Sequence, residues 1–311
     1  MSGGVISTGN HPKALLPGVK AWFGNTYESY EKQWIELVNE ESKSTRNYEE
    51  VVQDTGFAVA AVKPQGQGIP YDNNMQGYTT RAVHVTYAMG YAVTMEEIQD
   101  NLYEQVSMVR AKALAFSHAT ARELVVAGVL NNGFSSALQL IGDGQAFFST
   151  AHPFTSSNGT FANKPATDTD LSEASLEDGL IAVEGYLNDK GLQINVKAQK
   201  LIVARQNMFN AARILKSVLQ NDTGNNAINA IKAVGAMPEG YCTNVYLTDS
   251  NAWFIKNQIP TGSGLVFYER MPVTFDKDND FNTKNALASA IQRFSVAVAD
   301  PRCYYGSSGS S

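Results

Sequence analysis

The chain has 311 residues, a formal net charge of −6 at pH 7 and a hydrophobic fraction of 43%. This length supports one large or two modest domains with a substantial buried core, and the apolar fraction argues against a disordered chain. Lysine and arginine are scattered along the sequence and form no basic stripe, which argues against sequence-specific nucleic-acid recognition.

The N-terminal sequence and the cysteine content argue against a secreted or membrane protein and against a protein stabilised by zinc or disulfides. The N-terminal string "MSGGVISTGN" has neither a charged nor an apolar signal region, and no apolar run approaches the roughly 20 residues of a membrane span. We therefore expect a soluble protein with no membrane partner. The cysteines Cys242 and Cys303 lack CxxC spacing and nearby histidine, so we expect reduced thiols and neither a zinc site nor a disulfide framework.

The first 48 residues mix Gly, Pro, Asn and aromatic residues. Pro12 and Pro17 argue against an early helix, but apolar side chains then recur at helical spacing: Tyr27, Tyr30, Trp34, Leu37 and Val38. This pattern predicts one short amphipathic helix in an otherwise extended arm. Such an arm has too little core of its own, so we expect it to pack on the main body or on another copy.

An unusually long alternating run follows. The string "RAVHVTYAMGYAVT" (81–94) keeps a period of two over about 14 residues, whereas typical strands have 5–6. A second run, "TGFAVAAVK" (55–63), and the turn-rich string "PQGQGIPYDNNMQG" (64–77) precede it. Together they predict a projecting hairpin. Because a lone two-stranded hairpin is marginal in water, we expect it to lie against another surface, such as a neighbouring subunit.

The next element is a predicted long helix. "TMEE" at 94–97 has the pattern of a reciprocal capping box, and apolar residues then recur every three or four positions until "NNG" at 131–133. A helix over 94–133 would be about 55 Å long, which is typical of a spine helix.

Helices and strands alternate in the rest of the chain. "DLSEASLEDGLIAVEGYLNDKG" (170–191) predicts a helix with Asp170 as N-cap and Gly191 at its end. We then expect a strand at "KLIVA" (200–204), a helix from Met208 and a strand at "NVYLTD" (244–249), which indicate an α+β layer. The C-terminal region is strand-rich, in "LVFYER", "PVTFD", "AIQRFSVAVAD" and "RCYYG", and the closing "GSSGSS" predicts a flexible tail.

The string "GDGQAFFSTAHP" (142–153) places His152 near Ser149 and Thr150. A serine hydrolase needs a nucleophile on a sharp elbow, an orienting carboxylate and an oxyanion hole, and the G-x-S-x-G pattern is missing. We interpret the string as a hairpin built on the "GDG" turn, with the imidazole hydrogen-bonded to a loop carbonyl. A hydrolase using His152 is kept as an alternative.

The other candidate motifs do not match known metal, dinucleotide or catalytic sites. We therefore assign no catalytic, cofactor-binding or metal-binding residue. In the acidic run "DKDND" (276–280), Phe281 and Leu287 stand where an EF-hand needs Gly and Glu, so we interpret the run as a solvated turn. "GQG" (66–68) does not precede a helix, as a dinucleotide loop would. The remaining histidines lie on different predicted elements, without metal-ligand spacing: His11, His84 and His118. The sequons at Asn158 and Asn221 carry no meaning without a secretory route.

Several strings, in order along the chain, resemble a known family. They are "FFSTAHP" (147–153), "DLSEASLEDGLIAV" (170–183), "DKGLQI" (189–194), "KLIVARQNMFNAARILKS" (200–217), "NAINAIK" (226–232), "MPEGY" (237–241), "YLTDSNAWFIK" (246–256) and "FYERMPVTFDKDNDFNTKNA" (267–286). The ordered set is similar to tailed-bacteriophage major capsid proteins of the Hong Kong 97-type fold, in particular to the branch of the Mu-like phage major head subunit.

The resemblance implies an α+β capsid fold and a domain plan. The implied parts are an N-terminal arm (1–48), an extended E-loop hairpin (49–93), a P-domain with the spine helix (94–195), an A-domain (196–265), and C-terminal strands that return to the P-domain before a flexible tail (266–311). There is no long N-terminal extension of the kind that acts as a built-in scaffold in some relatives. Some relatives cross-link subunits through Lys and Asn, and Lys63 near the hairpin tip is a candidate.

The function implied by the resemblance is structural, with no enzymatic activity and no cofactor. Copies would assemble into hexamers and pentamers of an icosahedral shell around double-stranded phage DNA, in the host cytoplasm, with portal, scaffolding and decoration proteins as further partners. The acidic net charge fits a wall that binds DNA weakly and without sequence specificity. The alternatives are the shell of a cellular, encapsulin-like nanocompartment and, second, the hydrolase using His152.

Overall fold

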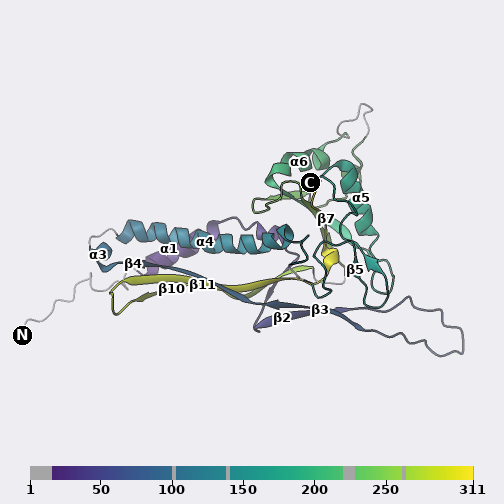
Figure 1. The fold of residues 1–311 in the computed structure, drawn as a ribbon, viewed down its shortest axis with the longest axis horizontal. Helices are drawn as coiled ribbons and strands as arrows, with labels where there is room; N and C mark the ends of the chain where they lie inside the picture. Colours follow the sequence, from purple (N-terminus) through teal and green to yellow (C-terminus); the bar gives the residue numbers. More distant parts are fainter. Residues whose placement is uncertain (1–15, 100–102, 138–140, 220–227, 261–263, 311) are drawn as a thin grey trace, which may run out of the picture. The chain divides into compact units, whose positions relative to one another are not determined.

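The computed structural model describes residues 16–99, 103–137, 141–219, 228–260 and 264–310. The chain divides into two compact units (Figure 1). Unit 1 comprises residues 1–32, 84–124 and 269–295, and unit 2 comprises residues 33–83, 125–268 and 296–311. Both units combine helices with strands, which confirms the predicted α+β class.

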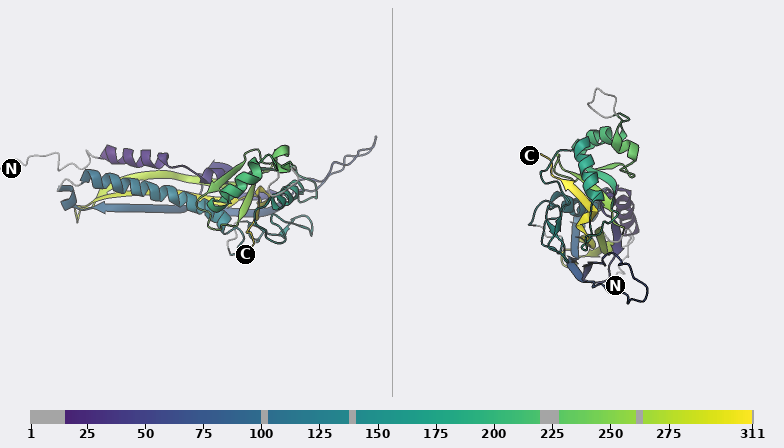
Figure 2. Two further views of the ribbon diagram at one scale, coloured as in Figure 1. Left: turned by 90° about the horizontal axis from the view of Figure 1, so that it is seen from above. Right: turned by 90° about the vertical axis from the view of Figure 1, so that its right-hand side faces the viewer.

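Unit 1 is built from helices packed on long strands. Its described elements are α1 (Leu16–Ser29), β4 (Val85–Val93), α3 (Met95–Gln99) and the larger parts of α4 (Tyr103–Asn131), β10 (Leu265–Asn279) and β11 (Ala286–Val298). Strand β4 pairs antiparallel with β11, which is also the neighbour of β10. Helices α1 and α4 lie along one face of these strands (Figures 1 and 2). Between them lies a core of Phe23, Ala111, Leu114, Ala115, Phe275, Ala288 and Ala290.

Unit 2 contains a four-stranded sheet in the order β12-β9-β7-β8. The sheet strands are β7 (Lys197–Ala204), β8 (Tyr241–Asn244), β9 (Trp253–Gln258) and β12 (Tyr304–Ser307), and its helices are α5 (Glu173–Glu184), α6 (Met208–Lys216) and α7 (Ala230–Val234). Short 3₁₀ helices are η3 (Arg205–Asn207) and η4 (Pro301–Cys303). The core between the sheet and the helices includes Leu176, Val183, Leu201, Val203, Ala211, Ile214, Trp253 and Ile255.

The other elements of unit 2 are short pieces and hairpins. They are α2 (Trp34–Leu37), β1 (Glu40–Lys43), β2 (Tyr48–Asp54), β3 (Gln76–Val83), β5 (His152–Pro153) and β6 (Thr160–Phe161). Strand β2 pairs with β3, β5 pairs with β6, and β1 pairs with β10.

The predicted hairpin exists, but its strands are not those expected. Strand β2 pairs with β3, and residues 55–75 between them form no strand, so the prediction of a strand over 55–63 was wrong. The alternating run 81–94 is shared between β3 and β4 and is interrupted at His84. Strand β4 pairs with β11 instead of belonging to the hairpin. Alternation reports only that a segment is extended; the neighbouring strand is set by tertiary contacts.

The arm and the long helix also differ in detail from the predictions. Helix α1 contains Pro17 in its first turn, where no backbone N–H is needed, so the expectation that Pro17 blocks a helix was wrong; Pro12 lies outside the described residues. The predicted helix over 94–133 corresponds to α3 and α4, and residues 100–102 lie outside the described part. Thr94 Oγ1 accepts from Glu97 N at 3.3 Å, whereas the Glu97 carboxylate pairs with Arg110 at 3.0 Å, so half of the capping box is present.

Helix α4 also bears on the membrane expectation. The segment Met108–Asn131 is long and apolar enough to span a membrane, contrary to our expectation from the sequence. Half of its apolar window is buried inside the protein, and a core helix meets the same criteria. Within it Arg122 pairs with Glu269 at 2.8 Å, which places a charge in the middle of the segment. These features are those of a helix covered by protein.

Five further predictions were wrong. Helix α5 is capped by Ser172, whose Oγ accepts from Ser175 N, and not by Asp170, and it ends at Gly185 and not at Gly191. The strand expected over 244–249 is β8, which ends at Asn244. Most of the acidic run 276–280 belongs to β10 and not to a turn. The closing "GSSGSS" is not a free tail, because its first two residues belong to buried β12.

Candidate functional site

His152 begins strand β5 and its side chain is fully buried. Its Nδ1 lies 2.6 Å from Asp143 Oδ2, and its Nε2 lies 3.2 Å from Asn163 Oδ1. We expected a loop carbonyl as its partner, and the partners are instead a carboxylate and a side-chain amide. The hairpin is also not built on "GDG": it is β5–β6, closed by Phe154 N donating to Gly159 O at 3.0 Å.

The hydrogen bonds of the Asn163 amide show which of its atoms faces the imidazole of His152. Asn163 Nδ2 donates to the carbonyls of Phe147 at 2.7 Å and Pro301 at 3.1 Å, so the amide oxygen faces His152. An oxygen can only accept, and the Asp143 carboxylate facing the other ring nitrogen can also only accept. Each ring nitrogen of His152 therefore faces an oxygen acceptor, Asp143 Oδ2 on one side and Asn163 Oδ1 on the other.

This geometry argues against the hydrolase alternative. A general base must present a free ring nitrogen to a hydroxyl, and both nitrogens of His152 are used. Ser149 Oγ accepts a hydrogen bond from Ala151 N at 3.2 Å, and Ser149 N donates to Asn163 at 2.8 Å. His152 and Ser149 thus hold a loop, which agrees with the interpretation of His152 as an anchor.

Phe161 connects His152 to the buried guanidinium of Arg302. The His152 and Phe161 rings stack with centroids 5.0 Å apart, and the Arg302 guanidinium lies 4.1 Å from the Phe161 centroid. Arg302 is buried in η4, pairs with Asp300 at 3.2 Å and donates to Leu187 O at 3.1 Å. The chain segment after α4 is therefore joined to the C-terminal segment through polar groups inside unit 2. The sequence did not indicate the roles of Asn163 and Arg302, because each forms hydrogen bonds with residues more than a hundred positions away along the chain.

Within the described part of the chain, the cysteines and the other histidines do not gather into a site. Burial raises the pKa of Cys242 to about 11 and raises that of Cys303 further above its ordinary value, as expected of inert thiols. Among the described residues, no cluster of His, Cys, Asp or Glu could hold a metal. His84 lies 2.9 Å from Ser295 Oγ, and His118 lies on α4. His11 and Asn221 lie outside the described residues.

The most unusual surface is the segment 55–75, which we call the projecting segment (Figure 1). It exposes a set of large apolar side chains: Phe57, Val59, Val62, Ile69, Tyr71 and Met75. Val62 is 93% exposed and Tyr71 is 94% exposed. Lys63 is exposed in the same segment. An apolar surface of this kind on a single chain is typical of a segment that is covered by another molecule.

The base of the projecting segment is held by specific hydrogen bonds. Thr55 N donates to Met75 O at 3.1 Å, and Asn74 Nδ2 donates to Asp54 Oδ2 at 2.9 Å. Asp72 Oδ2 accepts from Ala58 N at 2.7 Å, and this bond is the main cause of the lowered pKa of the Asp72 carboxyl. The pKa of the Asp54 carboxyl is lowered chiefly by the Gly56 N–H, which donates to Asp54 Oδ1 at 3.0 Å, and then by Asn74. The two sides of the segment are thus tied to each other by polar groups, while its apolar side chains remain exposed.

Similarity to known proteins agrees with this organisation. Residues 77–306 match the family model described as phage capsid protein. The fold is similar to a Mycobacterium phage Patience structure, with 12% identity, 97% of this chain and 88% of that chain covered, and a TM-score of 0.54. It is also similar to a Microbacterium phage Oxtober96 structure, with 11% identity, coverage of 89% and 90%, and a TM-score of 0.52. A virus-like particle from Pyrococcus furiosus matches with 10% identity, coverage of 93% and 98%, and a TM-score of 0.50. No curated protein matches.

The fold is therefore the Hong Kong 97-type capsid fold, as predicted. Because the family model covers about three quarters of the residues, the chain belongs to the phage capsid protein family. It is a structural major capsid protein, whose place is the icosahedral capsid of the virion.

Proposed function

We propose that this chain is the major head subunit of a tailed phage of the Mu-like branch. Its copies form hexamers and pentamers that close into a shell around double-stranded phage DNA, and assembly takes place in the host cytoplasm. The observation that carries the proposal is the projecting segment, which exposes apolar side chains that its own chain does not cover.

The energetics of the projecting segment favour a contact between copies. Burying a large aliphatic side chain contributes about 1.5–3 kcal/mol, and the segment offers several such side chains. A two-stranded hairpin such as β2–β3 is marginal in isolation, so covering its extension by a neighbour would stabilise both. Repetition of one modest contact over a whole shell then gives a stable particle.

The elements fit the roles that the resemblance implies. Within the predicted E-loop range 49–93, we assign this role to β2, β3 and the projecting segment; the pairing of β2 with β3, and of β4 with β11, supports this assignment. Helix α4 serves as the spine helix of the P-domain (94–195), the β7-β8-β9 region as the A-domain (196–265), and the first 48 residues as the arm. The strands of 266–311 return to the P-domain, with the modification that β12 replaces the expected flexible tail.

The proposed partners follow from a shell that encloses DNA. They are the portal, scaffolding and decoration proteins, and DNA held without sequence specificity. The net charge of −6 supports weak binding to DNA. The buried and doubly hydrogen-bonded His152 supports a purely structural role without enzymatic activity. The matching family model supports a phage head over a cellular nanocompartment.

The proposal can be tested by expressing the chain with the neighbouring head genes of its source genome. We expect closed shells in electron micrographs of the purified fraction and, when the packaging genes are present, nuclease-protected DNA inside them. Shells that contain a single cargo enzyme and no DNA would favour the nanocompartment. Only monomers under all assembly conditions would contradict a capsid role of either kind.

A further inference from the structure

A lysine from the body of unit 2 contacts the projecting segment. Lys190 Nζ donates to the backbone oxygen of Asn73 at 2.9 Å and lies 3.6 Å from Asp72 Oδ1. Lys190 follows α5 in the chain, 117 residues after Asn73. The Lys190 side chain is only 17% exposed. These contacts are therefore less screened by solvent and salt than those of a typical surface ion pair.

The turn that carries Lys190 is itself held by hydrogen bonds. Asn188 Oδ1 accepts from the backbone N–H groups of Lys190 at 3.0 Å and Leu192 at 2.8 Å, and Asn188 N donates to Leu192 O at 2.8 Å. Gly191, within the turn, has a φ of +78°, which residues with a side chain rarely adopt. The backbone from which the Lys190 side chain extends is thus fixed in position.

Asp72 connects the Lys190 contact to the other side of the projecting segment. Its Oδ2 accepts from Ala58 N at 2.7 Å, and its Oδ1 accepts from Asn73 N at 2.8 Å. The carboxylate that faces the ammonium group therefore also joins the two sides of the segment. Hydrogen bonds to an ionised acceptor are roughly twice as strong as neutral ones. Through Asp72 and Asn73, Lys190 holds both sides of the segment.

Two other contacts hold the β2–β3 hairpin at its strands. Gln53 Nε2 of β2 donates to Ala299 O at 3.0 Å, and Gly142 N donates to Thr80 Oγ1 of β3 at 3.0 Å. Lys190 instead contacts residues beyond the paired strands. A segment without ladder hydrogen bonds keeps much of its conformational freedom, so contacts at the strands alone leave its direction open. The Lys190 contact is placed to remove that freedom.

We propose that Lys190 is a positioning residue, which fixes the direction of the projecting segment in the free subunit before another copy covers that segment. A segment that is already held in one direction loses less conformational entropy when it is covered. Fixing the backbone of one further residue corresponds to about a factor of ten in an equilibrium constant. The inference deepens the proposed function: the role in the free subunit stands alone, and the gain in assembly rests on the association of copies.

The direction of the segment can be measured in the free subunit. Genetically encoded spin-label residues replace Val62 in the segment and Ile181 on α5, which are 93% and 70% exposed, and pulsed electron paramagnetic resonance gives the distribution of distances between them. Lys190→Met removes the ammonium group and keeps the apolar stem, so we expect a broader distribution than in the parent. Lys190→Arg keeps a charged donor and should restore the parent's distribution. Equal distributions in Lys190→Met and the parent would overturn the inference.

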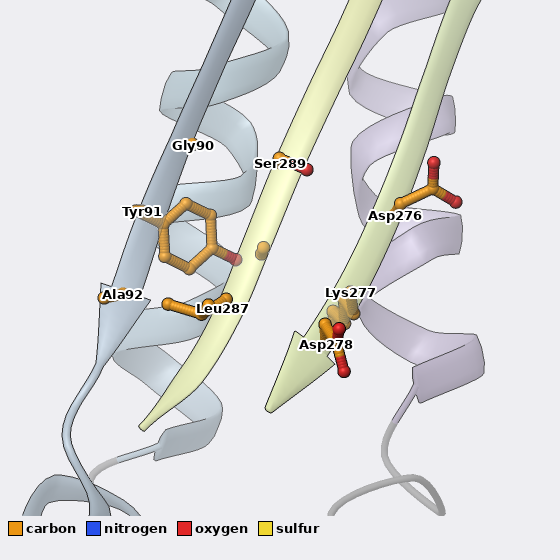
Figure 3. Close-up of a pocket in the computed structure, with 9 residues that line it drawn as sticks. Gly90, Tyr91, Ala92, Asp276, Lys277, Asp278, Leu287 and Ser289 are labelled. Carbon is orange, nitrogen blue, oxygen red and sulfur yellow. The ribbon is translucent and has the colours of Figure 1, made fainter. Parts of the chain in front are cut away.

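Hydrogen exchange tests the part played by Asp72. Asp72→Asn removes the charge and keeps an acceptor oxygen, so the Ala58 amide should exchange about tenfold faster than in the parent. Asp278 is the matched control, because it also accepts from the following backbone N–H at 2.8 Å but lines a hollow in unit 1 (Figure 3). Asp278→Asn should leave the exchange of Ala58 unchanged. An Ala58 amide that is equally protected in Asp72→Asn and the parent would contradict the connection between the two sides.

Assembly separates the two parts of the inference. Lys190→Met should require about a tenfold higher subunit concentration to form shells, while its unfolding in urea stays that of the parent. Lys197→Met makes the same change at an exposed lysine of β7 and should assemble like the parent. Shells of Lys190→Met at the parent's concentration would overturn the gain in assembly. If the parent itself forms no shells, the proposed function fails, whereas the distance distributions in the free subunit still decide the role of Lys190.

Discussion

Replacing Val62 by Asp should separate assembly from folding. Val62 is 93% exposed in the projecting segment, so its side chain contributes almost nothing to the stability of the isolated chain. Substitutions at such positions change the free energy of unfolding by no more than about 0.5 kcal/mol. Val62→Asp should therefore have the folding stability of the parent and differ from it only in the assembly of subunits.

The effect on assembly can be estimated from the buried area. Full burial of a valine side chain contributes about 1.5–3 kcal/mol, and we take about 2 kcal/mol for a contact made once per subunit. Because about 1.4 kcal/mol corresponds to a factor of ten, the subunit concentration needed for assembly should rise about 30-fold. Desolvation of the new carboxylate would increase this factor.

The assay is light scattering of purified subunits over a range of concentrations, with electron microscopy of the products. Lys63→Arg is the matched control, since it alters the adjacent exposed residue while keeping its charge and an apolar stem. Circular dichroism and urea unfolding should be the same for the variants and the parent. Assembly of Val62→Asp at the parent's concentration would refute the argument that the projecting segment is covered by a neighbouring copy.

Three further predictions concern the interior. Asn163→Leu leaves the Phe147 and Pro301 carbonyls without donors, so urea unfolding should show a loss of at least about 3 kcal/mol; a loss below about 1 kcal/mol would contradict the role of Asn163. Burial lowers the pKa of His118, so the unfolded chain binds a proton more readily and stability is lost as pH falls below about 6.5; His118→Phe should reduce the difference in unfolding free energy between pH 7.5 and pH 5, and an unchanged difference would count against it. Gly142→Ala would place Cβ 2.2 Å from the Thr79 carbonyl oxygen and should lower the melting temperature, whereas Gly128→Ala, whose nearest contact is 3.9 Å away, should leave it unchanged or raise it.

The type of most elements could be predicted from the sequence, because local periodicity and capping residues are local properties. The alternation of 81–94 correctly indicated extended backbone, and the three- to four-residue spacing after Thr94 correctly indicated a long helix. The pairing of strands was harder to predict, since β4 pairs with β11, about two hundred residues away in the chain. A strand at 55–63 was predicted from apolar residues that are exposed in this chain and pair with no neighbouring strand.

The buried polar groups were the least predictable. His152 was interpreted from the sequence as a loop anchor, but its actual partners, Asp143 and Asn163, were not predicted. The C-terminal residues show the same limitation. Their Gly and Ser composition is typical of a flexible tail, yet Ser307 Oγ donates to Thr169 O at 2.8 Å within a buried strand. Composition predicts how flexible a segment is in isolation. Hydrogen bonds to residues far along the chain can nevertheless hold that segment in a fixed conformation.

The most direct test of the account is a cryo-electron microscopy map of the assembled particle. We predict a closed icosahedral shell in which residues 55–75 lie on a neighbouring subunit, with Val62 and Tyr71 covered by that neighbour. A shell in which this segment remains exposed to solvent, or folds back over its own subunit, would contradict the central claim that the projecting segment joins copies of the chain.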